Sequence, residues 1–409
     1  MKVNVIGLGY IGLPTALMLA SHGVEVVGTD YNKELVATLN SGHTTFSEKG
    51  LDALFDSARD RGIVFTTEYQ SAGMYIISVP TPYDADTKKI DPSYVVAAVE
   101  STLAVCPEEA ILVIESTVSP GTMDKYIRPV LESHGRTAGT DVHLVHAPER
   151  IIPGNMVDEL FYNNRTIGAD DLTIGERVKE VYASFCQGDI EVTDICTAEM
   201  TKVVENTFRD INIAFANELA KICRSDGMDV YEIIRIANKH PRVNILSPGP
   251  GVGGHCISVD PWFLVGDYPR LTNLISTARD INDSMPDFVL ARASEIMKAE
   301  GIDSPSKVGI YGLTYKEDVD DIRESPTLQM LESMKRHLCA GACKVYDPWV
   351  EDDIVPEQVH SMEEFLDGLE MIIVMVGHSE LKERLASLGQ RVILDTRNVC
   401  GTGDRIYKL

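Results

Sequence analysis

The 409-residue sequence lacks several features that would each indicate a class of protein. No apolar run approaches the roughly 20 residues that a transmembrane helix needs. The formal charge of −25 leaves no basic excess for binding a nucleic acid or an anionic membrane. The eight cysteines show no Cys-x-x-Cys spacing, which favours reduced thiols over a metal site. We therefore expect a cytoplasmic protein with no metal, nucleic-acid or membrane partner.

The first 30 residues contain a complete nucleotide-binding signature. Strands are expected at residues 2–6 and 24–29, with a helix over residues 13–22 between them. Gly-x-Gly-x-x-Gly occupies the first turn, and an acid ends the second strand, where it can accept a hydrogen bond from a ribose 2′-hydroxyl. We expect NAD as the cofactor, bound here by Gly7, Gly9, Tyr10, Ile11, Gly12 and Asp30.

The strand and helix pattern predicts two doubly wound Rossmann-like α/β domains joined by a long central helix. A parallel sheet is expected to continue to about residue 190. Residues 197–224 contain no Gly or Pro and are expected to form one helix, with Thr197 as N-cap and Gly227 just after its end. The expected division is residues 1–192 for NAD binding, 193–300 for a helical region that includes a thiol-bearing loop, and 301–409 for a second Rossmann-like domain that binds a nucleotide of a different kind. The last segment repeats the βα pattern.

A single thiol lies in a loop that is rich in glycine and proline. Seven of the fourteen residues 248–261 are Gly or Pro, and Cys256 and Asp260 lie near the end of this stretch. Such a loop brings the backbone close to a ligand. A thiol there can trap an aldehyde as a hemithioacetal, which then loses a second hydride. We therefore interpret Cys256 as a nucleophile rather than as a small core residue.

Lys202 and Asn206 are four residues apart on the expected central helix and therefore share one face. An ammonium and an amide on one face suit an oxyanion that develops as hydride leaves. A solvated helix face is the alternative that the pattern alone leaves open.

Several motifs occur in order along the whole chain: Gly7-x-Gly9-Tyr10-x-Gly12, Val79-Pro80-Thr81-Pro82, Glu115-Ser116-Thr117, Pro148-Glu149-Arg150, Gly253-Gly254-His255-Cys256 and Gly312-Leu313-x-Tyr315-Lys316. Together they resemble the UDP-glucose/GDP-mannose 6-dehydrogenase family. Residues 240–246 and 249–263 are most similar to the branch of that family that acts on UDP-N-acetyl-D-mannosamine.

The resemblance implies two successive NAD-dependent oxidations of a UDP-sugar C6 alcohol, giving a uronic acid for surface polysaccharide. It implies a homodimer or larger homo-oligomer that forms through residues 193–300, and a UDP-sugar-binding domain in residues 301–409. It implies that Cys256 is the nucleophile, Lys202 and Asn206 assist it, and Asp260 is the carboxylate beside it. Thr117 and Glu149 match a pair that positions water near the nicotinamide. Further residues match cofactor or substrate contacts: Thr81 and Arg323 for the cofactor; Arg150, Gly253 and Lys316 for the substrate; and Arg242 for a phosphate of the substrate in the neighbouring subunit. Arg397, which follows the strand expected to end at Asp395, is a second candidate for the same anion.

The sequence departs from the glucose enzymes at two positions. They carry a second glutamate where this chain has Pro153, and a lysine where it has Val259. How hydrolysis is assisted is therefore left open. UDP-N-acetylglucosamine or UDP-glucose stays an alternative substrate. A two-electron hydroxyacid dehydrogenase and a catalytically silent NAD-binding regulator are the alternatives of other classes.

Overall fold

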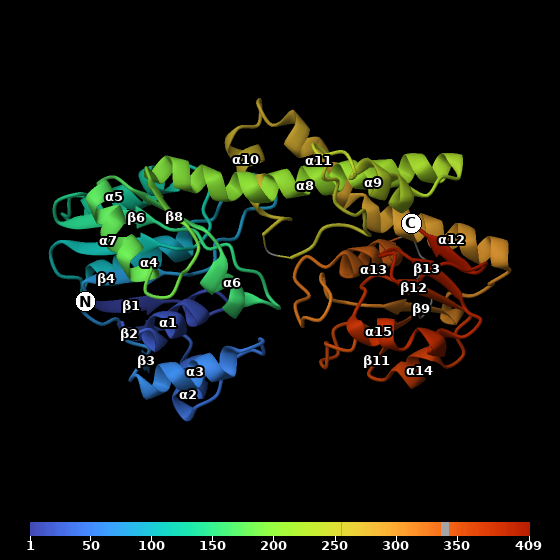
Figure 1. Cartoon of the computed structure of the whole chain (residues 1–409), viewed down its shortest axis with the longest axis horizontal. Coiled ribbons are helices and arrows are strands. Elements are labelled where there is room, and N and C mark those ends of the chain that lie inside the picture. The colour runs from blue at the N-terminus through green and yellow to red at the C-terminus, as the bar shows by residue number, and fades with distance from the viewer. Residues whose placement is uncertain (255, 337–342) are drawn as a thin grey trace. The chain divides into compact units, whose positions relative to one another are not determined.

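The computed structural model describes residues 1–254, 256–336 and 343–409, so His255 of the thiol motif lies outside the described residues. The chain forms two compact units, Met1–Glu205 and Asn206–Leu409. Helix α8 (Ile195–Asp226) runs through the boundary between them (Figure 1).

Unit 1 is built around an eight-stranded sheet with the order β3-β2-β1-β4-β5-β6-β7-β8. Its strands are β1 (Lys2–Ile6), β2 (Glu25–Thr29), β3 (Val64–Thr66), β4 (Met74–Ile77), β5 (Ala110–Ile114), β6 (Val142–His146), β7 (Arg165–Ala169) and β8 (Ile190–Thr193). Its helices are α1 (Gly12–Ser21), α2 (Lys33–Ser41), α3 (Leu51–Asp60), α4 (Ser93–Leu103), α5 (Arg128–Ser133), α6 (Met156–Tyr162) and α7 (Leu172–Tyr182), with a short π-helix at Met123–Ile127. The central strands are apolar on both faces, as expected for strands covered by helices.

Unit 2 contains a six-stranded sheet with the order β11-β10-β9-β12-β13-β14, in which every pair is parallel. Its strands are β9 (Val308–Tyr311), β10 (Lys344–Tyr346), β11 (Gln358–Val359), β12 (Met371–Val374), β13 (Val392–Asp395) and β14 (Ile406–Lys408). Its helices after α8 are α9 (Val230–Ala237), α10 (Asp260–Asp267), α11 (Asn273–Asp283), α12 (Met285–Glu300), α13 (Pro326–Arg336), α14 (Met362–Leu366) and α15 (Ser379–Glu383); short 3₁₀ turns lie at Pro305–Lys307 and Leu385–Leu388. One apolar core joins the second half of α8, α12 and α13 to the sheet.

The structure confirms the predicted fold class and corrects two details. The first sheet is not wholly parallel, because β7 runs antiparallel to β6. Helix α8 begins at Ile195 rather than after Thr197. Asp194 caps it instead, accepting from the Thr197 amide at 2.9 Å and the Thr197 hydroxyl at 2.6 Å. Gly227, with φ of 69°, follows the helix end as expected. The three-way domain division stays a prediction.

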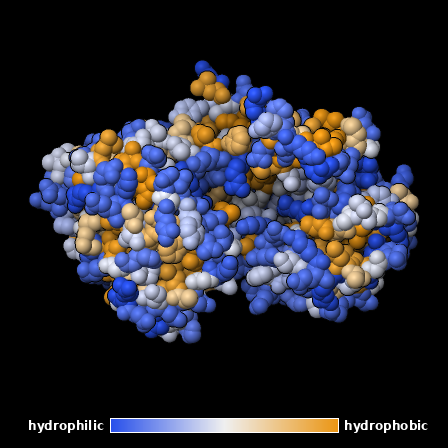
Figure 2. Space-filling model, in the orientation of Figure 1, coloured by the Kyte–Doolittle hydropathy of each residue, from blue (hydrophilic) through white to orange (hydrophobic). Residues whose placement is uncertain are grey.

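Hydrophilic side chains cover most of the face in Figure 2, with apolar patches over α8 and its neighbouring helices. In the described part of the chain, no helix is both long enough and apolar enough to cross a membrane. The exposed apolar residues of α8 are Val204, Phe208, Phe215 and Ile222.

Replacing Asp194 with alanine should lower the free energy of unfolding by about 1 kcal/mol, the usual cost of losing an N-cap. Hydrogen bonds from Thr197 lower the pKa of Asp194. The cap therefore stabilises the protein at neutral pH and is lost as the pH falls below the ordinary aspartate range. Urea denaturation at two pH values measures this, with Glu191→Ala as the exposed control. Equal stability of the two variants at neutral pH would contradict the assignment.

Candidate active site

The turn between β1 and α1 has a shape that only glycine permits. Gly7 has a φ of 86°, and a Cβ there would lie 2.3 Å from the carbonyl oxygen of Ser78. A Cβ on Gly12 would lie 1.9 Å from the carbonyl oxygen of Gly7. A Cβ on Gly9 would meet no protein atom within 4 Å. The turn therefore lets a pyrophosphate approach the backbone at the N-terminus of α1.

Asp30 holds this turn from the end of β2. Its carboxylate accepts from the amides of Leu8 and Asn32, each at 2.8 Å. Helix α1, which follows the glycine turn, begins after Ile11, and the side chain of Ile11 does not cap it. The ring of Tyr10 packs 4.5 Å from that of Phe46, between centroids. The turn and its carboxylate fit NAD, because they offer backbone amides to phosphate and an acceptor to a ribose hydroxyl.

Two further predicted residues lie together where β4 and β5 end. The hydroxyl of Thr81 donates to the carbonyl oxygen of Thr117 at 2.7 Å. Ser116 ties the same two segments, because its hydroxyl accepts from the Val79 amide at 2.9 Å and donates to the Val79 carbonyl at 2.7 Å. The structure thus places Thr81 and Thr117 on one rigid edge of the sheet.

Glu149 is buried, and both of its carboxylate oxygens are engaged. Oε1 accepts from the amides of Arg150 and Ile151 at 2.6 and 3.2 Å. Oε2 pairs with the guanidinium of Arg165 at 2.6 Å. These contacts hold the Glu149 side chain in place, and through it they order residues 149–151. Its predicted part in positioning water stays a proposal.

Arg150 is held as firmly as Glu149. Its guanidinium makes a bidentate pair with Glu205, at 2.7 and 2.8 Å, and donates to the Asn164 carbonyl and the Thr166 hydroxyl at 2.6 and 2.9 Å. In this arrangement Arg150 connects the loop after β6 to α8 and β7. A contact with substrate stays a prediction.

Glu115 belongs to one of the family motifs, but the sequence predicted no role for it and did not identify its partner Tyr182. Glu115 accepts from Ser78 at 2.5 Å and from Tyr182 at 2.9 Å. Burial, with the nearby charge of Glu149, raises the pKa of Glu115 to about 7, against the opposing effect of Arg165. The sequence sign of a special role for Glu115 is its position directly after the apolar strand β5. The cluster links the turn after β4 to α7.

Helix α8 presents two predicted residues one turn apart, and both are buried. The side-chain amide of Asn206 donates to the carboxylate of Asp260 at 2.6 Å. The structure thus brings together Asn206 and Asp260, which are 54 residues apart in the chain. Lys202 lies on the preceding turn of the same helix, as the spacing predicted.

Cys256 is half-buried and lies four residues before the first residue of α10, whose N-cap is Val259. Its carbonyl oxygen accepts from the amides of Asp260 and Val259 at 2.8 and 3.1 Å. Cys256 therefore begins the turn that leads into this helix.

Two more asparagines of α8 hold the segment before the thiol, and neither was predicted from the sequence. Asn212 accepts from the Leu246 amide at 2.9 Å, and Asn217 accepts from the Gly249 amide at 2.9 Å. The only local sign of these contacts is the recurrence of asparagine along a helix that contains no Gly or Pro. Their partners could not be identified from local sequence, because they lie more than 30 residues away.

Gly253, Lys316 and Arg323 belong to unit 2. A Cβ on Gly253 would lie 2.6 Å from the Glu324 carbonyl oxygen, so this position also requires glycine. Lys316 is half-buried, and Arg323 is exposed and pairs with Asp321 at 2.6 Å. The structure places all three on or against the segment that follows β9.

The two remaining predicted arginines differ in environment. Arg242 is exposed. Arg397 donates to the Met375 carbonyl at 2.8 Å, and burial lowers its pKa. A Cβ on Gly249 would lie 3.1 Å from a guanidinium nitrogen of Arg397. Arg397 therefore borders the start of the thiol loop, whereas Arg242 is free to meet solvent or another molecule.

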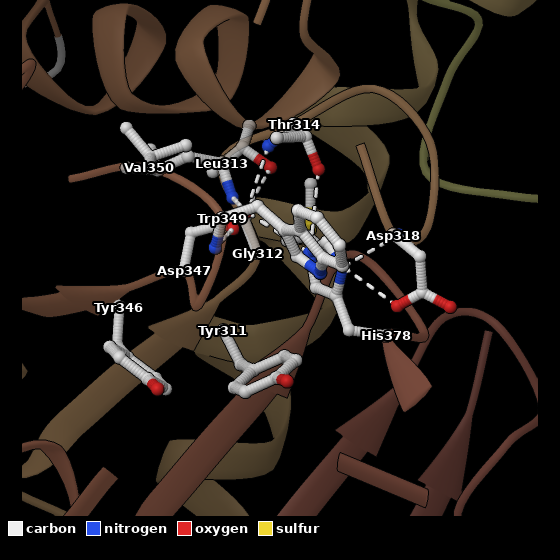
Figure 3. Close-up of polar contacts among 12 residues, drawn as sticks. Tyr311, Gly312, Leu313, Thr314, Asp318, Tyr346, Asp347, Trp349, Val350 and His378 are labelled. Atoms are coloured by element: carbon white, nitrogen blue, oxygen red, sulfur yellow. Dashed lines mark hydrogen bonds and ion pairs between the residues drawn. The ribbon is translucent and has the colours of Figure 1, made fainter. Parts of the chain in front are cut away.

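The turn after β9 resembles the turn after β1, but its aspartate makes more hydrogen bonds with described residues of the protein. Asp347 accepts from the amides of Leu313 and Trp349 at 2.6 and 2.8 Å, much as Asp30 does with its own turn. His378, at the start of α15, also contacts this carboxylate: its Nε2 lies 3.1 Å from Oδ2 of Asp347 (Figure 3). The described residues therefore supply Asp347 with four hydrogen-bond partners, namely the amides of Leu313, Thr314 and Trp349 and the ring of His378, against two for Asp30.

Comparison with known proteins agrees with this architecture. The chain matches the UDP-glucose/GDP-mannose dehydrogenase family in three segments: the NAD binding domain over residues 1–186, the central domain over 196–284 and the UDP binding domain over 309–402. These matches confirm NAD as the cofactor and an oxidoreductase as the class of enzyme.

Individual relatives cover almost the whole chain. A UDP-N-acetyl-D-mannosamine dehydrogenase from Methanococcus aeolicus is 41% identical over 97% of this chain and 91% of its own. An NDP-N-acetyl-D-galactosaminuronic acid dehydrogenase from Ralstonia nicotianae is 40% identical over 97% of this chain and 96% of its own. The solved UDP-N-acetyl-mannosamine dehydrogenase of Staphylococcus aureus has a TM-score of 0.89 at 41% identity, covering 100% of this chain and 98% of its own.

Three matched segments in the expected order, and relatives of this identity over the full length, lead to one conclusion. The chain belongs to the UDP-glucose/GDP-mannose dehydrogenase family.

Proposed function

We propose that the protein oxidises the C6 alcohol of UDP-N-acetyl-D-mannosamine to the carboxylate, through a covalent intermediate on Cys256. The observation that carries this proposal is the setting of that thiol: it is half-buried in the turn that leads into α10, where Asp260 accepts a hydrogen bond from Asn206. The product would be UDP-N-acetyl-D-mannosaminuronate, for surface polysaccharide. The cytoplasmic location stays a prediction.

The proposed reaction proceeds in three steps. Loss of a hydride and a proton converts the C6 alcohol to an aldehyde. The thiolate of Cys256 adds to this aldehyde, and the thiohemiacetal loses a second hydride and a proton to become a thioester. Water then cleaves the thioester to the carboxylate and restores the thiol. Bound NAD supplies the hydride acceptor, and two NAD molecules are used per sugar.

The proposed roles of the other residues follow from their contacts. Lys202 would stabilise the oxyanion, being a buried cation one turn before Asn206. The side-chain amide of Asn206 donates to Asp260, so the proposed role of Asn206 includes orienting that carboxylate. Glu149 and Thr117 would position the hydrolytic water through the fixed loop and strand edge to which they belong.

Substrate anchoring is proposed for the cations of unit 2. Lys316 and Arg397 would meet the UDP moiety, which is dianionic and needs local positive charge in so acidic a chain. Arg323 would contact the cofactor. The proposed assembly is a homodimer, supported by Phe208, Phe215 and Ile222, which recur every seven residues on the exposed side of α8. Arg242 is exposed and would reach the phosphate of a substrate bound to the neighbouring subunit.

The sugar assignment rests on the names of relatives and on the resemblance of residues 240–246 and 249–263 to the N-acetylmannosamine branch. A relative that is almost as similar is named for an N-acetylgalactosaminuronic acid, so another N-acetyl sugar is the second candidate. Both share the N-acetyl group, which a pocket recognises by shape and apolar contact.

Efficiency across a UDP-sugar panel tests this assignment. We predict a kcat/KM for UDP-N-acetylmannosamine at least roughly tenfold above that for UDP-glucose, since a pocket built for the N-acetyl group loses binding when the group is missing. NADH formation measures the rates. A ranking with UDP-glucose first would refute the sugar and leave the family intact.

Cofactor preference tests Asp30. Its carboxylate should repel a 2′-phosphate, giving clear preference for NAD over NADP. Asp30→Asn keeps an oxygen for the Leu8 amide but removes the charge, so the ratio of kcat/KM for the two cofactors should fall roughly tenfold. Asp60→Asn, on the exposed end of α3, is the control and should leave the ratio unchanged. An unchanged ratio in Asp30→Asn would argue against this placement.

NADH yield tests the role of Cys256. The wild type should give about two NADH per sugar, as two hydride transfers require. Cys256→Ala should lose carboxylate production while it retains NAD and UDP-sugar binding by calorimetry. Cys196→Ala, at an exposed thiol of unit 1, is the matched control and should behave as wild type. Uronic acid formation by Cys256→Ala near the wild-type rate would exclude covalent catalysis.

A further inference from the structure

The thiol loop, defined here by its described residues 248–254 and 256–259, rests on the segment that follows β9. The amide of Gly254 donates to the carbonyl oxygen of Arg323 at 2.9 Å. A Cβ on Gly254 would lie 2.8 Å from Cε2 of Tyr315, so the backbone two residues before Cys256 lies directly against this ring. The charge of Cys256 also contributes, after burial and Asp321, to the raised pKa of Tyr315. Displacement of this support would displace the residues next to the nucleophile.

The supporting segment, residues 312–325, is named the β9–α13 loop here. It contains two non-glycine residues with positive φ: 57° at Asp318 and 50° at Glu324. Each such residue costs on the order of 1 kcal/mol, so contacts with the rest of the unit must hold the loop in this form. Inside the loop, the amide of Tyr315 donates to the Asp321 carbonyl at 3.1 Å.

His378 provides an anchor from outside the loop. It lies at the start of α15 and is fully buried. Its Nδ1 lies 3.0 Å from the amide nitrogen of Asp318, one of the two strained residues. The Asp318 carboxylate in turn accepts from the amide and hydroxyl of Ser379 at 2.9 and 2.5 Å. The loop and the start of α15 therefore bond to each other in both directions (Figure 3).

The hydrogen bonds of His378 fix its tautomer. A backbone amide can only donate, so Nδ1 must accept from Asp318, and the proton lies on Nε2. Nε2 faces the Asp347 carboxylate at 3.1 Å. Asp347 also binds the Leu313 and Thr314 amides at 2.6 and 3.0 Å, at the other side of the same loop. One imidazole thus connects the beginning of the β9–α13 loop to its strained middle.

We propose that His378 is a positioning residue for Cys256: it holds the β9–α13 loop in the conformation on which the thiol loop rests. The link runs from His378 to Asp318, along the loop to Tyr315 and the Arg323 carbonyl, and from there to Gly254. His378 itself takes no part in the chemistry. The inference deepens the proposed function, since it concerns the nucleophile assigned there.

Two substitutions of His378 test the roles of its two ring nitrogens separately. Asparagine can place its oxygen near Nδ1 and keep the acceptor for the Asp318 amide, whereas glutamine can keep the donor toward Asp347 and lose that acceptor. We expect His378→Gln to lower kcat roughly ten- to a hundredfold, the cost of displacing a reacting group by about 1 Å. KM for NAD should change less than about twofold, because the glycine turn of unit 1 is untouched. His378→Asn should retain most of the wild-type kcat.

Hydrogen exchange followed by mass spectrometry supplies the structural readout, with no substrate present. His378→Gln should speed exchange in peptides covering residues 312–325 and 248–259 but not in residues 2–29. The control is His360→Gln, at an exposed histidine of the same unit. Tyr315→Ala tests the link from its other end, and should speed exchange in residues 248–259 even if His378→Gln fails to fold.

The proposal is overturned if the thiol-loop peptides of His378→Gln or Tyr315→Ala exchange at the wild-type rate, or if the glutamine and asparagine variants lose kcat equally. Failure of the proposed function would look different. A wild type that yields one NADH per sugar would remove the covalent role of Cys256, while the exchange result would still report whether His378 fixes the loop.

Discussion

The hydrogen bond from Asn206 to Asp260 is the interaction on which the arrangement of the thiol depends. Both side chains are buried, and the bond is 2.6 Å long. It fixes the start of α10, and with it Cys256, against the rigid helix α8. Asn212 and Asn217 hold the preceding segment to the same helix. Ordering a glycine-rich loop costs much conformational entropy. These hydrogen bonds, spaced along one helix, hold the loop in a single conformation.

The same turn is used twice in the chain with different results. In both units a glycine with positive φ ends the first strand of the βα pattern, and an aspartate ending the second strand binds the next backbone amide. The turn after β1 keeps the shape that suits a dinucleotide. In unit 2, His378 engages the corresponding carboxylate, so the turn has become a structural anchor. The first turn serves a ligand, whereas the second, on our proposal, serves the thiol loop.

The sequence predicted the parts of this protein whose signals are local. The glycine turn, Asp30, the long helix and the thiol loop are each recognisable within about 30 residues, because turn geometry and helix periodicity are local properties. The N-cap of α8 was misplaced by three residues, because aspartate and threonine both serve as caps. The antiparallel pairing of β7 was missed, because strand direction depends on the connection and not on strand composition.

The side chains that fix the site were mostly beyond sequence reasoning. Arg165, Tyr182 and His378 act through contacts with residues that lie 16 to 67 positions away. Nothing near them in the chain marks these partners. Buried charged pairs of this kind are decided by tertiary packing, which a single sequence does not reveal.

Trapping the covalent intermediate tests the central proposal most directly. Wild-type enzyme turning over NAD and UDP-N-acetylmannosamine is quenched in acid, digested, and analysed by mass spectrometry. We predict a nucleotide-sugar adduct on the peptide that contains Cys256, absent from Cys256→Ser and from a reaction without NAD. An unmodified Cys256 peptide throughout turnover, while uronic acid accumulates, would contradict covalent catalysis by this residue.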